Sequence, residues 1–111
     1  MEGIGIFLYN NGDKYEGNLK DGLREGNGTY YYNDGGRYEG DWINNKREGK
    51  GIMHYNNGDQ YEGDWKNDKK EGKGLVYYKD GDQRMGYYSN DKPIGKHALL
   101  KNNGEIKIIN F

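Results

Sequence analysis

The tripeptide Tyr-Glu-Gly recurs three times in this chain at a constant interval. It begins at Tyr15, Tyr38 and Tyr61, so both intervals are 23 residues. A fixed period of this size is typical of a small supersecondary unit that is copied in tandem. One such unit cannot bury its apolar side chains alone, so neighbouring units must stack to form a core. The sequence therefore predicts an array of repeats.

Glycines and turn dipeptides follow the same period along the whole sequence. Two glycine positions and one Asn-Gly or Asp-Gly position recur from repeat to repeat, and such dipeptides favour tight turns between strands. These positions are Gly3, Gly26, Gly49, Gly72 and Gly95, then Gly5, Gly28, Gly51 and Gly74, then Asn11-Gly12, Asp34-Gly35, Asn57-Gly58, Asp80-Gly81 and Asn103-Gly104. Helix is a poor fit because a glycine in a helix interior costs about 1 kcal/mol. We predict an all-β fold with two strands per repeat.

The second complete repeat illustrates the predicted strands. One strand covers 38–42 and the other 49–55, with a loop at 43–48 inside the repeat and a turn leading to the next repeat. A two-residue turn, Asn57-Gly58, would pair Tyr61 with His54 and divide the aromatic side chains between the two faces of the sheet. A three-residue turn, 56–58, would instead pair Met53 with Tyr61, Gly51 with Gly63 and Gly49 with Trp65. We favour the three-residue turn because it gathers the aromatic residues on one face, where Gly49 and Gly51 leave room for an indole ring.

This pattern resembles the MORN (membrane occupation and recognition nexus) repeat. The best match is Tyr38-Glu39-Gly40-Asp41-Trp42, followed by Gly49-Lys50-Gly51 and Asn57-Gly58-Asp59. Together with the predicted strand pairs, it implies a single elongated twisted antiparallel sheet built from tandem β-hairpins. The expected domain is 1–111, with a partial repeat at 1–14, repeats at 15–37, 38–60 and 61–83, a degenerate capping repeat at 84–106 and a closing strand to 111.

The fourth repeat departs from the motif at several positions. Arg84 replaces the tyrosine, Met85 the glutamate, Tyr88 the tryptophan and His97 the second glycine. Terminal repeats of an array are commonly atypical because they have a neighbour on one side only.

The residues that catalysis requires are scarce. The chain has one serine, one threonine, two histidines and no cysteine, so a nucleophile beside a base is not evident. The recurring glutamates Glu16, Glu39 and Glu62 would stand roughly 10 Å apart on successive repeats, too far for a shared cation. We expect no enzyme activity, no cofactor and no metal site. The absence of cysteine suits a reducing compartment, so a cytoplasmic location is expected.

The aromatic positions are the predicted binding site. Resemblance to MORN arrays implies an elongated groove that binds a helix or an extended segment of a partner protein within a cytoplasmic, cytoskeletal assembly. Exposed aromatic side chains are enriched at binding hot spots. The predicted partner-binding residues are Tyr15, Tyr38, Trp42, Tyr55, Tyr61, Trp65 and Tyr78.

Two further interpretations of the surface remain open. The loops inside the repeats carry a basic rim that would attract acidic phospholipid head groups, formed by Lys46, Arg47, Lys50, Lys69, Lys70 and Lys73. After subtraction of nearby carboxylates this attraction is ~3 kcal/mol, which gives only millimolar binding. The array is alternatively the targeting portion of a larger enzyme. The net charge of −1 argues against nucleic acid as a partner, and open sheet edges predict pairing with a second copy of the chain.

Overall fold

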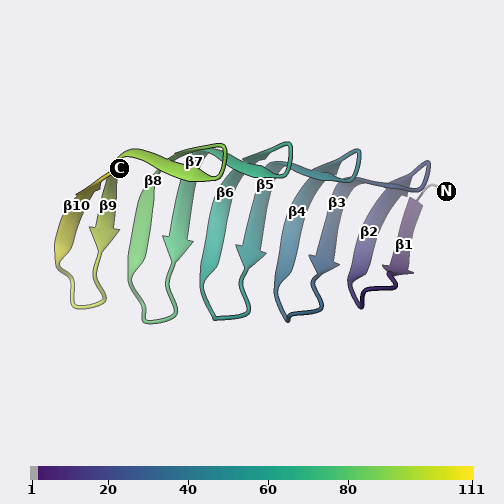
Figure 1. Ribbon diagram of the computed structural model, residues 1–111, viewed down its shortest axis with the longest axis horizontal. Coiled ribbons are helices and arrows are strands. Elements are labelled where there is room, and N and C mark those ends of the chain that lie inside the picture. Colours follow the sequence, from purple (N-terminus) through teal and green to yellow (C-terminus); the bar gives the residue numbers. More distant parts are fainter. Residues whose placement is uncertain (1–2) are drawn as a thin grey trace.

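The computed structural model describes residues 3–111, which form ten strands in one antiparallel sheet (Figure 1). Each strand pairs with its neighbours in sequence, in the order β1 to β10, and the sheet does not close on itself. The predicted all-β, single-sheet fold is therefore confirmed. The strands are β1 Gly3–Leu8, β2 Lys14–Lys20, β3 Leu23–Tyr31, β4 Arg37–Ile43, β5 Lys46–His54, β6 Gln60–Lys66, β7 Lys69–Tyr77, β8 Gln83–Ser89, β9 Lys92–Leu100 and β10 Ile106–Asn110.

The molecule is elongated across its strands. Its extents are 49 × 23 × 19 Å, and the longest one follows the succession of strands in Figure 1. Two strands at a spacing of ~4.8 Å advance the array by roughly 10 Å per repeat. Met1 and Glu2, with which the predicted partial repeat 1–14 begins, lie outside the described residues. Across residues 3–111 the structure has no helix of the length and hydrophobicity needed to cross a membrane.

The turns between repeats have the predicted three-residue geometry. Met53 pairs with Tyr61 across β5 and β6, while His54 pairs with Gln60. Gly58 has a φ of 98°, a left-handed conformation that glycine adopts without steric cost. The backbone N–H of Gly58 donates to the carbonyl of Tyr55 at 3.1 Å, which closes the turn. The predicted register is confirmed, because Gly51 also pairs with Gly63 and Gly49 with Trp65.

The connection inside each repeat is shorter than predicted. The expected loop at 43–48 is a two-residue turn, because β4 continues to Ile43 and β5 begins at Lys46. Asn44 and Asn45 both have positive φ, 48° and 69°, as a hairpin turn of type I′ requires. Asparagine tolerates this conformation better than other residues with a Cβ atom. The predicted loop was too long, because the two asparagines supply the left-handed residues of a tight turn and Lys46 and Arg47 already lie in a strand.

The core is built from tyrosine rings that lie over glycines. The side chains of Tyr15, Tyr38 and Tyr61 are 0% exposed. Tyr38 covers Gly51 of the next strand so closely that a Cβ atom on Gly51 would overlap its ring. The corresponding tyrosines of the neighbouring repeats cover Gly28 and Gly74 in the same way. The predicted role of glycine as a trough is thus correct, but the ring that fills the trough is a tyrosine and not the predicted indole.

The tyrosine hydroxyls are hydrogen-bonded to backbone within their own repeat. The hydroxyl of Tyr15 donates to the carbonyl of Asn18 at 2.8 Å, and that of Tyr38 donates to the carbonyl of Asp41 at 3.1 Å. Both acceptors lie where the strand register is shifted, so these bonds satisfy backbone groups beside an irregularity of the ladder. Burial raises the pKa of Tyr15 to about 12, which keeps its hydroxyl protonated and able to donate.

The tryptophans connect one repeat to the next. The indole of Trp42 packs edge-on against Tyr38 of its own repeat and against Tyr15 of the preceding one, at centroid distances of 5.1 and 5.7 Å. Its Nε1–H donates to the carbonyl of Gly28 at 3.1 Å. Because such contacts recur, the rings form one continuous chain through the sheet: Tyr15, Trp42, Tyr38, Trp65, Tyr61, Tyr88, His97 and Phe111.

Two departures of the fourth repeat compensate each other. Arg84 occupies the tyrosine position and provides no ring over the neighbouring strand, while His97 occupies the position of the covered glycine. The His97 ring is 0% exposed and lies over Gly86 of β8, so the strand that contributes the ring is exchanged. Its Nε2–H donates to the carbonyl of Tyr87 at 3.0 Å. The ring-over-glycine contact is therefore retained, but the strand that carries the ring and the strand that carries the glycine have exchanged roles.

A double substitution tests this exchange. His97→Gly alone is expected to lower the free energy of unfolding by about 2 kcal/mol, because Gly86 loses its cover and a cavity forms. Adding Arg84→Tyr is expected to restore at least half of the loss, because the new ring lies over the new glycine at position 97 as in the earlier repeats. Urea denaturation followed by circular dichroism measures both. Additive losses in the double variant would contradict the exchange.

Candidate functional site

The structure divides the predicted binding aromatics into two groups. Five of them are at most 4% exposed and belong to the core, namely Tyr15, Tyr38, Trp42, Tyr61 and Trp65. These side chains cannot be contact residues, because neighbouring repeats and side chains cover them. The prediction that these five residues contact a partner is therefore wrong. Tyr55 and Tyr78 are half-buried and pack against the core from its edge, so they keep ring surface that a partner can reach.

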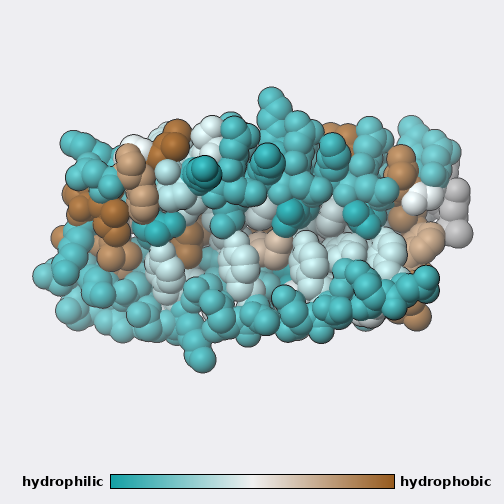
Figure 2. Space-filling view, viewed as in Figure 1, coloured by the Kyte–Doolittle hydropathy of each residue, from teal (hydrophilic) through white to brown (hydrophobic). Residues whose placement is uncertain are grey.

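Tyr55 and Tyr78 belong to a row of tyrosines with one member per repeat. Tyr9 and Tyr32 hold the equivalent positions earlier in the chain and are half-buried as well. Each ring follows the end of an odd-numbered strand, at the point where the turn between repeats begins. We call this row, Tyr9, Tyr32, Tyr55 and Tyr78, the tyrosine row. The prediction missed its first two members, although the 23-residue period indicates them. Figure 2 shows a pale band of intermediate hydropathy along the long axis between hydrophilic borders.

Cations from the odd-numbered strands lie over aromatic rings of the core. The guanidinium of Arg24 is 4.8 Å from the ring centroid of Trp42, and that of Arg47 is 4.7 Å from the ring centroid of Trp65. The ammonium of Lys70, one repeat later, is 4.9 Å from the ring centroid of Tyr61. Cations in this position are attracted by the negative face of an aromatic ring. Arg47 and Lys70 therefore cover the core, in contrast to the predicted free basic rim.

The same cations bind the following repeat. The Arg47 side chain donates from Nε to Asp68 Oδ1 at 3.1 Å and from Nη2 to the Asp68 carbonyl at 2.7 Å. Arg24 donates in the same way to the carbonyl of Asn45 at 2.8 Å. Lys50, also assigned to the basic rim, forms an ion pair with Asp64. The predicted rim is thus partly neutralised, and its exposed members are Lys46, Lys50, Lys69 and Lys73.

The rings and cations enclose two adjoining hollows. One has a volume of about 300 Å³ and is lined by Tyr32, Tyr55 and Met53 among others. The other, of about 220 Å³, is lined by Arg24, Tyr30 and Trp42 together with Asp68. Tyr32 and Arg47 line both hollows, so the two hollows adjoin at these side chains. We call this pair of hollows the aromatic channel.

Aspartates of the turns between repeats have structural roles. Asp13 is buried, accepts a hydrogen bond from the hydroxyl of Tyr30 at 2.7 Å and accepts another from the backbone N–H of Asn33 at 2.8 Å. The Tyr30 hydrogen bond lowers the pKa of Asp13 from its ordinary value. Asp82 accepts from the backbone N–H of Asn102 at 2.9 Å, and that bond lowers its pKa. Each carboxylate thus holds the turn of the following repeat.

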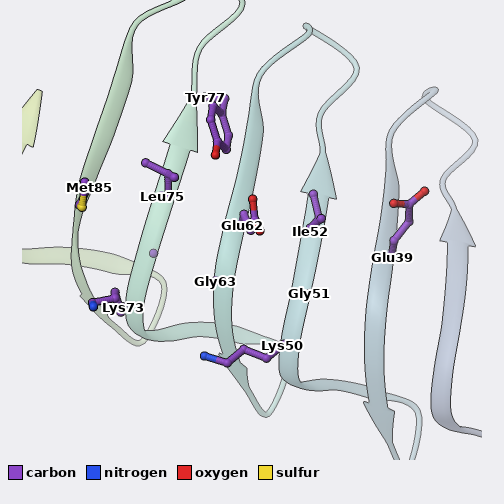
Figure 3. Close-up of a pocket in the computed structure, with 11 residues that line it drawn as sticks. Glu39, Lys50, Gly51, Ile52, Glu62, Gly63, Lys73, Leu75, Tyr77 and Met85 are labelled. Carbon is purple, nitrogen blue, oxygen red and sulfur yellow. The ribbon is translucent and has the colours of Figure 1, made fainter. Parts of the chain in front are cut away.

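The opposite face of the sheet carries a larger groove of about 590 Å³ (Figure 3). Gly51, Gly63 and Gly74 line it where successive strands pair through glycine. One wall is a cross-strand row in which acidic and apolar side chains alternate and which becomes apolar toward β8. It consists of Glu39, Ile52, Glu62, Leu75 and Met85. Lys50 and Lys73 stand on the other side of the groove in Figure 3. The prediction did not identify this groove, because it placed the partner-binding residues on the aromatic face of the sheet.

These surfaces offer shape, ring faces and charge for docking. Among residues 3–111, no group of three or more His, Cys, Asp or Glu side chains is arranged to hold a metal ion.

Comparison with known proteins identifies the family of the chain and a solved structure with a similar fold. A family model described as "MORN repeat" matches residues 1–14, 15–37, 38–60 and 61–83. A search of curated proteins finds no match. Among solved structures, the chain is similar to the TCP domain of SAS-4 (dCPAP) from Drosophila melanogaster, in complex with a proline-rich motif of Ana2 (dSTIL). The TM-score is 0.53 and the identity 20%, over 96% of this chain and 70% of that chain. This likeness shows a shared fold.

Proposed function

Because the chain belongs to the MORN repeat family, we propose that it is a non-enzymatic interaction module that docks an extended segment of a partner protein. The segment lies along the aromatic channel, which Tyr32 and Tyr55 line, and continues over the other members of the tyrosine row on either side of it. The observation that carries this proposal is the channel itself, in which Tyr32 and Arg47 line two adjoining hollows.

The spacing of the channel suits a polyproline II segment. Successive members of the tyrosine row are one repeat apart, roughly 10 Å along the array. A polyproline II helix rises about 3.1 Å per residue, so three residues advance it by about 9 Å. Prolines at every third position of a partner would therefore meet successive tyrosines. Pro-rich segments dock in aromatic-lined grooves because they lose little conformational entropy on binding.

The structural neighbour supports this choice of partner. The SAS-4 TCP domain has the same fold and was solved with a proline-rich motif bound. Together with the aromatic channel, that complex favours an extended segment over a helix as the occupant. The family resemblance further supports a place in a cytoplasmic, cytoskeletal assembly, which we include in the proposal.

Binding of acidic phospholipid is the competing proposal, and the charges of the structure weaken it. Arg47 is held by Asp68, Lys50 is paired with Asp64, and Lys70 lies over rings. At about 1 kcal/mol for each remaining cation near an anionic surface, the exposed lysines give weak attraction.

A peptide-binding experiment tests the proposal. A fluorescent peptide with proline at every third position is titrated with the protein, and anisotropy reports its binding. Tyr55→Ala and Tyr78→Ala are each expected to weaken binding about 5- to 30-fold, since one aromatic contact contributes roughly 1–2 kcal/mol. Tyr77→Ala is the matched control for Tyr78→Ala, because Tyr77 lies on the opposite face, in the groove of Figure 3.

The other outcomes discriminate between the alternatives. A peptide of the same length with leucine at heptad spacing that binds more tightly would replace the extended segment by a helix. The lipid proposal would be favoured if the protein binds vesicles containing phosphatidylserine at physiological salt and if the Lys46→Glu and Lys69→Glu substitutions abolish this binding. If Tyr77→Ala weakens peptide binding as much as Tyr78→Ala, the tyrosine row is not the site.

A further inference from the structure

The two outer edges of the sheet expose aliphatic side chains on the same face. On β1 the exposed fractions are 67% for Ile6 and 78% for Leu8, and on β10 they are 67% for Ile106 and 59% for Ile108. All four side chains share the face of the groove in Figure 3, because Ile6 pairs with Glu16 and Ile108 with Ala98. An edge strand with exposed apolar residues is a template for pairing with another strand.

The two edge strands are complementary halves of one repeat. β10 begins at Ile106, which is 23 residues after the first residue of β8, Gln83, so it holds the position of a first strand. β1 begins at Gly3, which is 23 residues before Gly26 of β3, so it holds the position of a second strand. Each complete repeat has a first strand and a second strand, and these two strands pair with each other, as β2 does with β3.

We propose that a second copy of this chain docks head to tail, with its β1 against β10 of the first copy. The pairing of β2 with β3 supplies the register, in which Lys14 pairs with Tyr31 and Glu16 with Thr29. The β2 residue of each pair is moved forward by four repeats to β10, and the β3 residue is moved back by one repeat to β1. The pairs then become Ile106 with Leu8 and Ile108 with Ile6 of the second copy. Lys107 with Phe7, between these two pairs, and Ile109 with Gly5, which follows them, fall on the other face.

The proposed pairing buries the exposed side chains in two adjacent cross-strand pairs. Each pair consists of two aliphatic residues that are more than half exposed in the single chain. Such pairs stabilise antiparallel sheets by contact between their side chains. The backbone N–H and C=O groups of both edges gain partners at the same time.

The even number of strands allows the second copy to continue the sheet in the same orientation as the first copy. Neighbouring strands alternate in direction through the 10-stranded sheet, so β1 and β10 run in opposite directions. A second copy that simply continues the array therefore presents β1 antiparallel to β10. Because this contact joins two different edges, it leaves one of each edge open and allows further copies to add.

Cysteine crosslinking tests the direction and register together. The chain contains no cysteine, so an introduced thiol has no competitor. Ile6→Cys and Ile108→Cys chains are prepared separately, with different affinity tags, and oxidised alone or as a mixture. The proposal predicts a disulfide-linked dimer that forms in the mixture at least about tenfold more than in either variant alone. Ile4→Cys mixed with Ile108→Cys is the control, because Ile4 is displaced by two residues along the same face.

Sedimentation analysis of the unmodified chain gives a second measurement. Its average mass is expected to rise with protein concentration, and Ile6→Lys is expected to shift this rise to at least about tenfold higher concentration. Met85→Lys is the control, since Met85 is 54% exposed in the same cross-strand row but lies inside the sheet. The proposal is overturned by a constant monomer mass at all concentrations. It is also overturned if Ile6→Cys or Ile108→Cys crosslinks alone as well as in the mixture, which would indicate pairing of like edges.

Discussion

Replacement of Trp42 by alanine is expected to lower the free energy of unfolding by about 4 kcal/mol, within the range for a fully buried tryptophan. The indole is 3% exposed and touches Tyr15 and Tyr38, so its loss leaves a cavity at the contact between two repeats. The carbonyl of Gly28 also loses its hydrogen bond from the indole. Urea denaturation followed by far-ultraviolet circular dichroism measures the change.

The adjacent residue supplies the control for this substitution. Ile43 is 50% exposed, and Ile43→Ala is expected to change the stability by less than about 1 kcal/mol because little buried surface is lost. If Trp42→Ala were as mild as Ile43→Ala, the ring chain would not be the source of coupling between repeats. Total unfolding of the array is an equally informative result, because domains of this size have only about 5–15 kcal/mol of net stability.

Introduction of a single methyl group at Gly51 is expected to cost about 3 kcal/mol or more. The new Cβ atom of Gly51→Ala would overlap the ring of Tyr38, which is fully buried and held by its hydroxyl hydrogen bond. Neither the ring nor the backbone beneath it can move without disturbing the neighbouring strand, and overpacking of this kind is costly. Thermal and urea denaturation both report the loss.

Gly5 is the matched control because it holds the same position in the repeat. A Cβ atom there would meet only Leu19 Cδ1, at 3.4 Å, which is an ordinary contact. Gly5→Ala is therefore expected to change the stability by no more than about 0.5 kcal/mol. Equal losses at Gly5 and Gly51 would show that backbone conformation, and not the tyrosine ring, selects glycine at this position.

Much of the architecture was predictable from the sequence because the determinants are local and repeated. The 23-residue interval predicts the number of strand pairs, and the parity of side chains between Met53 and Tyr61 predicts their register. The turn at 56–58 follows from Asn57-Gly58, since the glycine supplies the left-handed residue that the turn needs. The turn at Asn44 and Asn45 was missed because its left-handed residues are asparagines.

The candidate site was less predictable, since exposure depends on which side chains of the next repeat cover a ring. Tyr38 and Tyr55 are equally aromatic in the sequence, yet Tyr38 is enclosed between two tryptophans and Tyr55 lies at the edge of the core. Arg47 appears in the sequence as one more surface cation. In the structure it covers Trp65 and binds Asp68, and both partners belong to the following repeat.

The periodic residues alone therefore determine the repeat, its turns and the order of its strands, because turn chemistry and side-chain alternation act over a few neighbouring residues. Packing between repeats decides which aromatic rings remain accessible, which cations are neutralised and where the grooves lie. The exchange of roles between Arg84 and His97 shows this division clearly, since both residues break the motif and yet the sheet retains a ring over Gly86. A ring needs a complementary trough, and either of two paired strands can provide it.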